Sequence, residues 1–290
     1  MHNIREQGQC PRTADLTHIV SLELRANPDA WIQLVKVDAK MAHKRVRVLR
    51  KDWRYFAARF PRGKKGHWFI VNRVGTYGVS SAQYWWGRIA GLINRVVILI
   101  GLARWCLVYV DDFLAVYICD CPAEFWEAVA MLMLFLEAIG FPMSWKTFDA
   151  GRDMQWIGHH LDLHRNMVRP TEAKIDIALE FLWKIADKEI VSAKLLERRI
   201  GLIRFMSEVL PLITPFLQPL HTWVAGLVNT SLARPAGRPG ELHRAVARFI
   251  ISILNNVKSG ELPGHSMFLF SRTSRRVWVA AMRRQTHLWR

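Results

Sequence analysis

Cysteine is scarce in this sequence, which has four in 290 residues. They are Cys10, Cys106, Cys119 and Cys121; they show no CxxC spacing, and the last two lie too close along the chain for an ordinary structural disulfide. We therefore expect reduced thiols and an intracellular protein, in the nucleus or cytoplasm, that is not secreted.

Long apolar runs are also missing. The N-terminal residues form no apolar segment, so no signal peptide is expected. The most lipid-like window, residues 90–110, is interrupted by Arg95 and Arg104, whereas a membrane helix needs about 20 apolar residues. We expect this window to form a buried helix followed by a strand, and we expect no membrane partner.

Acidic residues are few relative to basic ones. The chain has 24 Asp and Glu against 41 Lys and Arg, which gives a formal charge of +17 and a pI near 10.3. This excess indicates a polyanionic partner, either nucleic acid or an acidic membrane surface. Thirteen Trp and fourteen Phe supply flat faces on which bases stack, and this favours nucleic acid.

Two adjacent acids between apolar runs are the most informative feature present. Residues 107–116 predict a strand hairpin with Asp111 and Asp112 at its tip, and residues 31–37 predict a strand that ends at Asp38. A buried carboxylate is costly unless a metal ion or a basic partner compensates it. Phosphoryl transfer uses two divalent cations, which prefer carboxylate oxygens, so these three acids would suit such a cluster if antiparallel strands bring them together.

The first half of the chain otherwise predicts mixed α and β elements, with 51% hydrophobic residues to form a core. Alternating basic and apolar residues predict a strand at 44–48, and residues 61–66 predict a turn between strands. A small-residue loop at 75–82 precedes a helix expected at about 82–100. After it, a helix capped by Asp120 is expected to end at Gly140. Its core stripe is expected to be Phe125, Val129, Leu132, Leu136 and Ile139.

The second half changes character. A strand pair is expected at 155–163, and the sheet-rich part is expected to end near residue 169. Helices are then expected at 171–186, 192–210 and 241–257. Residues 1–30 are weakly patterned and give no element.

Two local patterns have alternative interpretations. Basic residues between 44 and 65 alternate with aromatic ones between 53 and 69, which indicates either a solvated face or a nucleic-acid track; the aromatic interleaving favours the track. His159, His160 and His164 suggest a metal site, but they lie in strand-like sequence without zinc-helix spacing. Ordinary strand histidines are therefore expected.

Five motifs in order resemble the palm and thumb of retroelement reverse transcriptases. They are residues 36–43 with Asp38, the loop and helix start at 77–85, Tyr109-Val110-Asp111-Asp112, the Gly-containing turn with a lysine at 140–146, and Trp156-Ile157-Gly158. The series covers roughly residues 31–220. His43, Gly75-Thr76-Tyr77-Gly78 and Trp156-Ile157-Gly158 most resemble retrotransposons of the tyrosine-recombinase-encoding class.

The resemblance implies an RNA-directed DNA polymerase that joins dNTPs to a primer on an RNA or DNA template. It implies that Asp38 and Asp111 ligate two Mg²⁺ ions, with Mn²⁺ as an alternative, and that Asp112 assists. His43, Tyr77, Gly78 and Lys146 would form the nucleotide site, with Lys146 near the pyrophosphate. Trp156, Ile157 and Gly158 would form the primer grip.

The same resemblance implies an α+β polymerase palm, with an antiparallel sheet and packed helices, followed by a helical thumb. The expected domains are a truncated fingers segment at 1–30, a palm with partial fingers at 31–169, a thumb at 170–232 and a basic segment at 233–290. No aspartate follows Asp187, and Glu241 and Glu261 are the only acids after residue 210. We therefore expect no intact ribonuclease H.

One departure concerns the sugar. Family members commonly carry Tyr or Phe five residues after the first acid, where the ring excludes a ribose 2′-hydroxyl, whereas this chain has His43. Two other functions stay open on the sequence: a non-catalytic nucleic-acid-binding remnant of such an enzyme, and a basic structural α+β domain.

Overall fold

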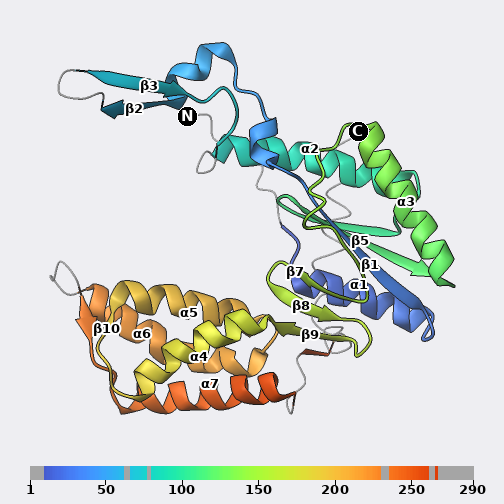
Figure 1. Cartoon of the computed structure of the whole chain (residues 1–290). Helices are drawn as coiled ribbons and strands as arrows, with labels where there is room; N and C mark the ends of the chain where they lie inside the picture. Colours follow the sequence, from blue (N-terminus) through green and yellow to red (C-terminus); the bar gives the residue numbers. More distant parts are fainter. Residues whose placement is uncertain (1–9, 62–65, 77–79, 230–234, 261–264, 267–290) are drawn as a thin grey trace, which may run out of the picture. The chain divides into compact units, whose positions relative to one another are not determined.

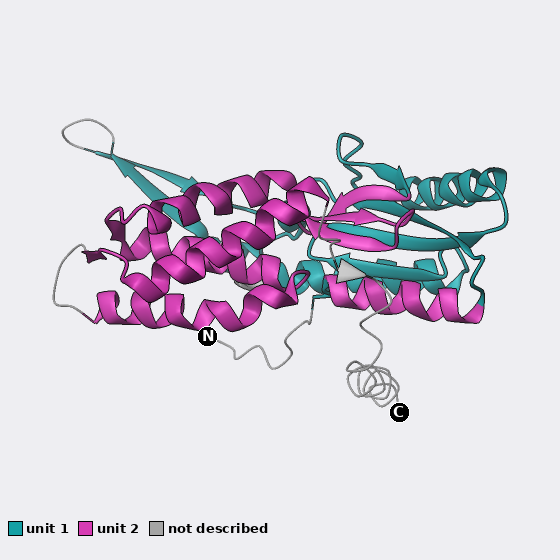
Figure 2. Ribbon diagram, turned by 90° about the horizontal axis from the view of Figure 1, so that it is seen from below, with its two compact units in different colours: residues 1–12, 27–151 teal, residues 13–26, 152–290 magenta. Residues whose placement is uncertain are grey.

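The computed structural model describes residues 10–61, 66–76, 80–229, 235–260 and 265–266. The chain divides into two compact units, coloured separately in Figure 2: residues 1–12 and 27–151 form unit 1, and residues 13–26 and 152–290 form unit 2. Every described strand pair is antiparallel, and helices pack with the sheets. The predicted α+β class with antiparallel sheets is confirmed.

The centre of unit 1 is a four-stranded sheet with the order β4-β5-β1-β6. Figure 1 labels its two central strands, β5 and β1. Its strands are β4 (Trp105–Tyr109), β5 (Asp112–Cys119), β1 (Trp31–Asp38) and β6 (Asp149–Gly151). β1 pairs with β5 along its whole length, from Trp31 opposite Cys119 to Asp38 opposite Asp112. The strand expected at 31–37 and the hairpin expected at 107–116 are both confirmed.

Two helices close one face of this sheet. α2 (Ser80–Leu99) and α3 (Pro122–Ala138) contribute to a single buried core with the strands. Its members from the helices include Trp86, Ala90, Val97, Phe125, Val129, Leu132 and Leu136. Val37 and Phe113 are buried in this core, so their side chains face the helices. Successive strand side chains point to opposite faces, and the alternate residues of β1 and β5 therefore lie on the other face of the sheet.

Between β1 and α2 the chain forms 3-10 turns and a two-stranded hairpin. These elements are η1 (Ala42–Arg45), η2 (Arg50–Phe56), β2 (Ala57–Pro61) and β3 (His67–Val71). The expected turn between strands is confirmed, although its residues 62–65 lie outside the described part. The strand expected at 44–48 is wrong.

That strand fails for a local reason. Met41 takes a left-handed φ of 58° and turns the chain into η1 directly after the β1 region. The segment then finds one isolated bridge, between Arg47 and Val74, in place of a ladder. Alternation of basic and apolar residues favours a strand only where a partner strand is present.

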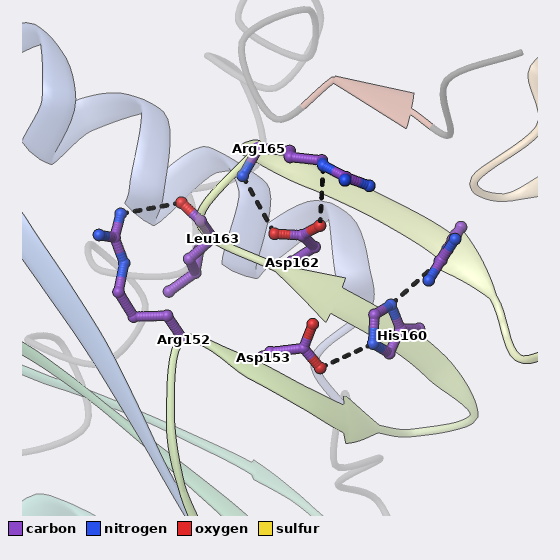
Figure 3. A network of polar contacts seen from close by, with 7 residues as sticks. Arg152, Asp153, His160, Asp162, Leu163 and Arg165 are labelled. Carbon is purple, nitrogen blue, oxygen red and sulfur yellow. Dashed lines mark hydrogen bonds and ion pairs between the residues drawn. The ribbon is translucent and has the colours of Figure 1, made fainter. Parts of the chain in front are cut away.

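Unit 2 contains a second four-stranded sheet with the order β12-β9-β8-β7. Its strands are β7 (Asp153–Trp156), β8 (His159–Asp162), β9 (Met167–Pro170) and β12 (His265–Ser266). Figure 3 shows the polar contacts on β7 and β8, where Asp153 accepts a hydrogen bond from His160 at 2.8 Å. The side chain of Arg152 donates to the Leu163 carbonyl at 3.0 Å, which ties the two ends of this strand pair together.

A helical bundle follows in the same unit. Its helices are α4 (Glu172–Ala186), α5 (Ala193–Ser207), α6 (Leu217–Val228) and α7 (Glu241–Ser259), with η4 (Pro211–Phe216) and the short pair β10 (Val191–Ser192) and β11 (Ala236–Gly237). α4 packs against α7 and α5, and α6 packs against α5 and α7. The three helices predicted at 171–186, 192–210 and 241–257 are confirmed.

Four details differ from the predictions. Residues 13–26 form a helix, α1 (Thr13–Ala26), in which Leu16, Ile19 and Val20 are buried. The prolines after residue 210 were expected to break the chain there, but this segment forms η4 and α6. The N-cap of α3 is Cys121, while the Asp120 backbone N–H donates to the Glu124 carboxylate. Ile139 follows α3 and is exposed, so it is not part of the core stripe.

None of the described helices is both long enough and apolar enough to span a membrane. This covers α2, which includes residues 90–99 of the apolar window at 90–110.

His159 on β8 gives unit 2 a pH-dependent stability. Its ring is fully buried, stacks on Phe205 of α5, and has no hydrogen-bond partner at either nitrogen among the described residues. Burial, with a smaller effect of Lys174, lowers the pKa of His159 from 6.5 to about 4. Protonation of His159 is therefore less favourable in the folded protein than in the unfolded chain.

We expect the contribution of His159 to the free energy of unfolding to be fully present above pH 6.5. It should be lost as the pH drops from about 6.5 to about 4, by at most about 3 kcal/mol. Thermal unfolding of wild type and His159→Leu across this range measures it. The variant should lose this part of the pH dependence, while the control His164→Leu, at an exposed position, should keep it. Equal pH profiles for wild type and His159→Leu would contradict the assignment.

Candidate functional site

The hairpin between β4 and β5 places the paired acids at its tip, as the sequence predicts. Tyr109 pairs with Asp112, which leaves Val110 and Asp111 as the two turn residues. Val110 has a positive φ of 56°, an unfavourable conformation for a β-branched residue. The buried indole of Trp86 on α2 donates a 2.7 Å hydrogen bond to the Val110 carbonyl and fixes the turn.

The first predicted acid meets this tip through strand pairing. Asp38, the last residue of β1, is the register partner of Asp112. Beyond it, the Ala39 N–H donates to the Asp111 carbonyl at 2.9 Å. Acids more than 70 positions apart in the sequence are therefore neighbours at one end of the sheet.

The segment that carries the predicted lysine lies along the same end of β1. The Ser144 N–H donates to the Asp38 carbonyl at 2.9 Å, and the Lys40 N–H donates to the Pro142 carbonyl. The Thr147 hydroxyl donates to Asp38 Oδ2 at 3.3 Å. Lys146, between these contacts, is exposed, so the structure brings the segment of Lys146 beside Asp38.

The acids repel one another in a partly buried setting. Burial, followed by the charges of Asp38 and Asp111, raises the pKa of Asp112 to about 6. Burial and Asp111 also raise the pKa of Asp38, although the Thr147 hydrogen bond and Lys36 oppose this. Lys36 lies two residues before Asp38 on the same face of β1, and its charge stabilises both carboxylates.

This donor set fits a hard cation in its chemistry, because adjacent carboxylates with raised pKa values gain most from a positive charge. Within the described ranges, however, no three His, Cys, Asp or Glu side chains are gathered closely enough to form a ready coordination cluster. Asp38, Asp111 and Asp112 interact through their charges and are not arranged as a preformed ligand shell.

His43 is brought against the small-residue loop. It is buried in η1, and a Cβ on Gly75 would lie 2.6 Å from the His43 carbonyl oxygen and 2.7 Å from Ala82 Cβ. Only glycine fits at position 75 without a shift of backbone. Tyr77 and Gly78, the other predicted residues of this loop, lie outside the described residues.

The predicted primer-grip residues form the turn between β7 and β8 in unit 2. Trp156 pairs with His159, and the two turn residues Ile157 and Gly158 have positive φ values of 40° and 80°, as in a type I′ hairpin turn. The Lys174 ammonium donates to the Gly158 carbonyl at 3.0 Å and lies 4.1 Å from the centre of the Phe205 ring. Burial lowers the pKa of Lys174.

Several residues that shape these turns or stabilise the acids were not predicted from the sequence. The role of Lys36 could have been predicted, because strand alternation places it on the same face of β1 as Asp38. Trp86 carried a general signal, since a buried indole N–H needs an acceptor, but its partner was not readable. Thr147 and Lys174 contact residues that are distant in the sequence, Asp38 and Gly158, so no local sequence pattern indicates these contacts.

The comparison with solved structures supports the architecture. Neither a family model nor a curated protein matches the sequence. Among solved structures, the foamy viral protease-reverse transcriptase in complex with RNA/DNA hybrid matches with a TM-score of 0.55 and 16% identity over 80% of this chain and 28% of that one. Its dRH form in complex with double-stranded DNA matches with a TM-score of 0.58 and 16% identity over 90% of this chain and 39% of the other.

A third structure, the same viral protein in complex with double-stranded DNA, has a TM-score of 0.52 and 18% identity over 80% of this chain and 42% of that one. The fold is reverse-transcriptase-like. This chain spans less than half the length of each of these three chains. It holds the predicted acids in unit 1 and the Trp156–Ile157–Gly158 turn in unit 2.

The Gly158 turn yields a direct test of its packing. A Cβ at Gly158 would overlap Lys174 Nζ and would occupy a left-handed backbone conformation. We expect Gly158→Ala to destabilise the protein by about 1–3 kcal/mol in denaturant unfolding.

Gly226→Ala is the matched control, because Gly226 lies in α6 and an added Cβ meets nothing within 4 Å. This control should be neutral or up to about 1 kcal/mol stabilising. Equal stability of Gly158→Ala and wild type would show that the turn tolerates a side chain.

Proposed function

We propose that the chain is an RNA-directed DNA polymerase of a retrotransposon of the tyrosine-recombinase-encoding class. It would transfer a nucleotide from a dNTP to a primer 3′-hydroxyl. The observation that carries this proposal is the pairing of Asp38 with Asp112, beside Asp111, within a reverse-transcriptase-like fold. Similar structures hold an RNA/DNA hybrid or double-stranded DNA, which supports a nucleic-acid substrate.

In this proposal Asp38 and Asp111 hold two Mg²⁺ ions, or Mn²⁺, and Asp112 assists. Bound ions would activate the attacking hydroxyl and would neutralise charge on the leaving pyrophosphate. Trp86 keeps the turn at Val110 in place, and Thr147 and Lys36 orient and stabilise the acids.

The other predicted residues complete the substrate contacts. Lys146 is exposed beside the Asp38 strand and would pair with the pyrophosphate. His43, Tyr77 and Gly78 would contact the nucleotide, and the turn of Trp156, Ile157 and Gly158 would hold the primer end. The planar imidazole of His43 would exclude a 2′-hydroxyl in the place of the Tyr or Phe ring of family members.

The central prediction is that primer extension depends on the acidic pair, Asp111 and Asp112. Asp111→Asn removes a carboxylate charge with little change of shape, so we expect magnesium-dependent primer extension to fall by at least about 100-fold. Asp120→Asn, at an exposed position at the far end of β5, is the control and should retain activity. Primer extension with RNA and DNA templates, and with deoxy- and ribonucleotides, measures this and the role of His43. Unchanged extension by Asp111→Asn would refute the assignment.

A second candidate function is a non-catalytic nucleic-acid-binding remnant of such an enzyme. The lack of a preformed cluster of three ligating side chains in the described residues favours it. It predicts binding without any incorporation by wild-type protein. Detectable incorporation that Asp111→Asn removes would reject it.

Both functions require a nucleic-acid surface, and α5 offers one in unit 2. Lys194 and Arg198 are exposed and lie one helical turn apart, so they share a face. If each neutralises one phosphate, Lys194→Ala with Arg198→Ala should weaken duplex binding and reduce the slope of log K against log salt by about 2.

The matched control is Lys184→Ala with Lys258→Ala, which removes the same charge from lysines already paired with Glu180 and Asp176. Fluorescence anisotropy at several salt concentrations measures both. A control that loses as much slope as the α5 variant would show that the net charge, and not the α5 face, drives binding.

A further inference from the structure

α2 carries two apolar stripes on different sides. One stripe, with Trp86, Ala90 and Val97, is buried in the unit 1 core. The other leaves large side chains in water: Trp85 is 53% exposed, Leu92 62% and Leu99 82%. Ile89 belongs to the same stripe and is also exposed.

The exposed stripe has the spacing of a helix-pairing seam. Trp85, Ile89, Leu92 and Leu99 follow one another at intervals of four, three and seven residues. Half-buried Val96 divides the last interval into four and three. This is the alternation that lets one helix pack its side chains between those of a second helix.

α3 also has apolar side chains on more than its buried side. Its inner side, with Phe125, Val129, Leu132 and Leu136, faces the core. On its outer side, Trp126, Met131 and Leu134 are each more than half exposed. A second exposed apolar stripe therefore lies in unit 1, which also contains α2. Figure 1 labels both helices.

The two helices carry opposite charges. α2 contains Arg88 and Arg95 and no acidic residue, while α3 contains Glu124, Glu127 and Glu137 and no basic residue. Pairing α2 with another α2 would oppose like charges, and so would pairing α3 with α3. Pairing α2 with α3 brings opposite charges together, which sets the partner choice of helices.

A second copy of the chain supplies this complement. In a two-fold dimer, α2 of one copy would face α3 of its partner, and the same contact would form twice, as isologous interfaces require. The stripe of α2 runs over residues 85–99, about 21 Å along the helix, and that of α3 runs over residues 126–134, about 12 Å. We propose that the outer faces of α2 and α3 form a dimer interface between two copies of this chain.

The charge pattern allows a mixing test by sedimentation velocity of the full chain without nucleic acid. Arg95→Glu alone places glutamate against acidic α3 in both contacts, and Glu127→Lys alone places lysine against basic α2 in both. Each should weaken dimerisation at least about tenfold. An equimolar mixture of the two variants should associate again, because both contacts of the mixed dimer then join opposite charges.

Apolar variants and a control complete the experiment. Leu92→Gln and Leu134→Gln should each give monomers with an unchanged far-ultraviolet circular dichroism spectrum, because both side chains are exposed. Glu189→Lys makes the same charge change as Glu127→Lys at an exposed position in unit 2 and should leave the dimer intact.

Three results would overturn the proposal. Wild-type protein that stays monomeric up to about 100 μM would exclude a stable dimer of this kind. A dimer that Leu92→Gln and Leu134→Gln leave unchanged would use another surface. A mixture of Arg95→Glu and Glu127→Lys that does not associate would exclude the pairing of α2 with α3.

Discussion

The register between β1 and β5 is the constraint on which the candidate site depends. Burial of Val37 and Phe113 in the core fixes which side of each strand faces the helices. Strand side chains alternate, so the same choice places Asp38 and Asp112 together on the opposite side. A slip of one residue would exchange the two sets and bury a carboxylate in the core. The packing that stabilises unit 1 is therefore also what brings the acids together.

The sequence predicts those parts of the site that depend on periodicity. Strand alternation and β-prone residues are local properties, and they gave β1, the β4–β5 hairpin and the positions of Asp38, Asp111 and Asp112 at strand ends. The bond from Thr147 to Asp38 joins residues 109 positions apart, and no local pattern encodes it. The helix α1 was not predicted, because its buried side chains become apparent only in the folded chain. The strand predicted at 44–48 is wrong, because a strand needs a partner strand as well as an alternating pattern.

The β4–β5 turn and the β7–β8 turn have the same kind of backbone strain, and each is held by a hydrogen bond from a helix side chain. Val110 and Ile157 are β-branched residues with positive φ, which cost about 1–3 kcal/mol each where the surroundings do not impose them. At each turn a helix side chain donates to a turn carbonyl: Trp86 to Val110 and Lys174 to Gly158. Such strain is maintained where the exact direction of a backbone matters, so these helix contacts belong to the sites as much as the turns do.

The overall charge of +17 does not neutralise the acids at the β1–β5 end. Salt screens charges beyond about 10 Å at 0.1 M, and Lys36 is the basic residue whose charge stabilises both Asp38 and Asp112. The pKa of Asp112 is nevertheless raised to about 6, so at neutral pH the carboxylate is mostly ionised in a setting that disfavours its charge. A proton or a cation relieves this repulsion, and the two compete. A chain with a large positive net charge can thus keep, around these three acids, a local field that favours a cation.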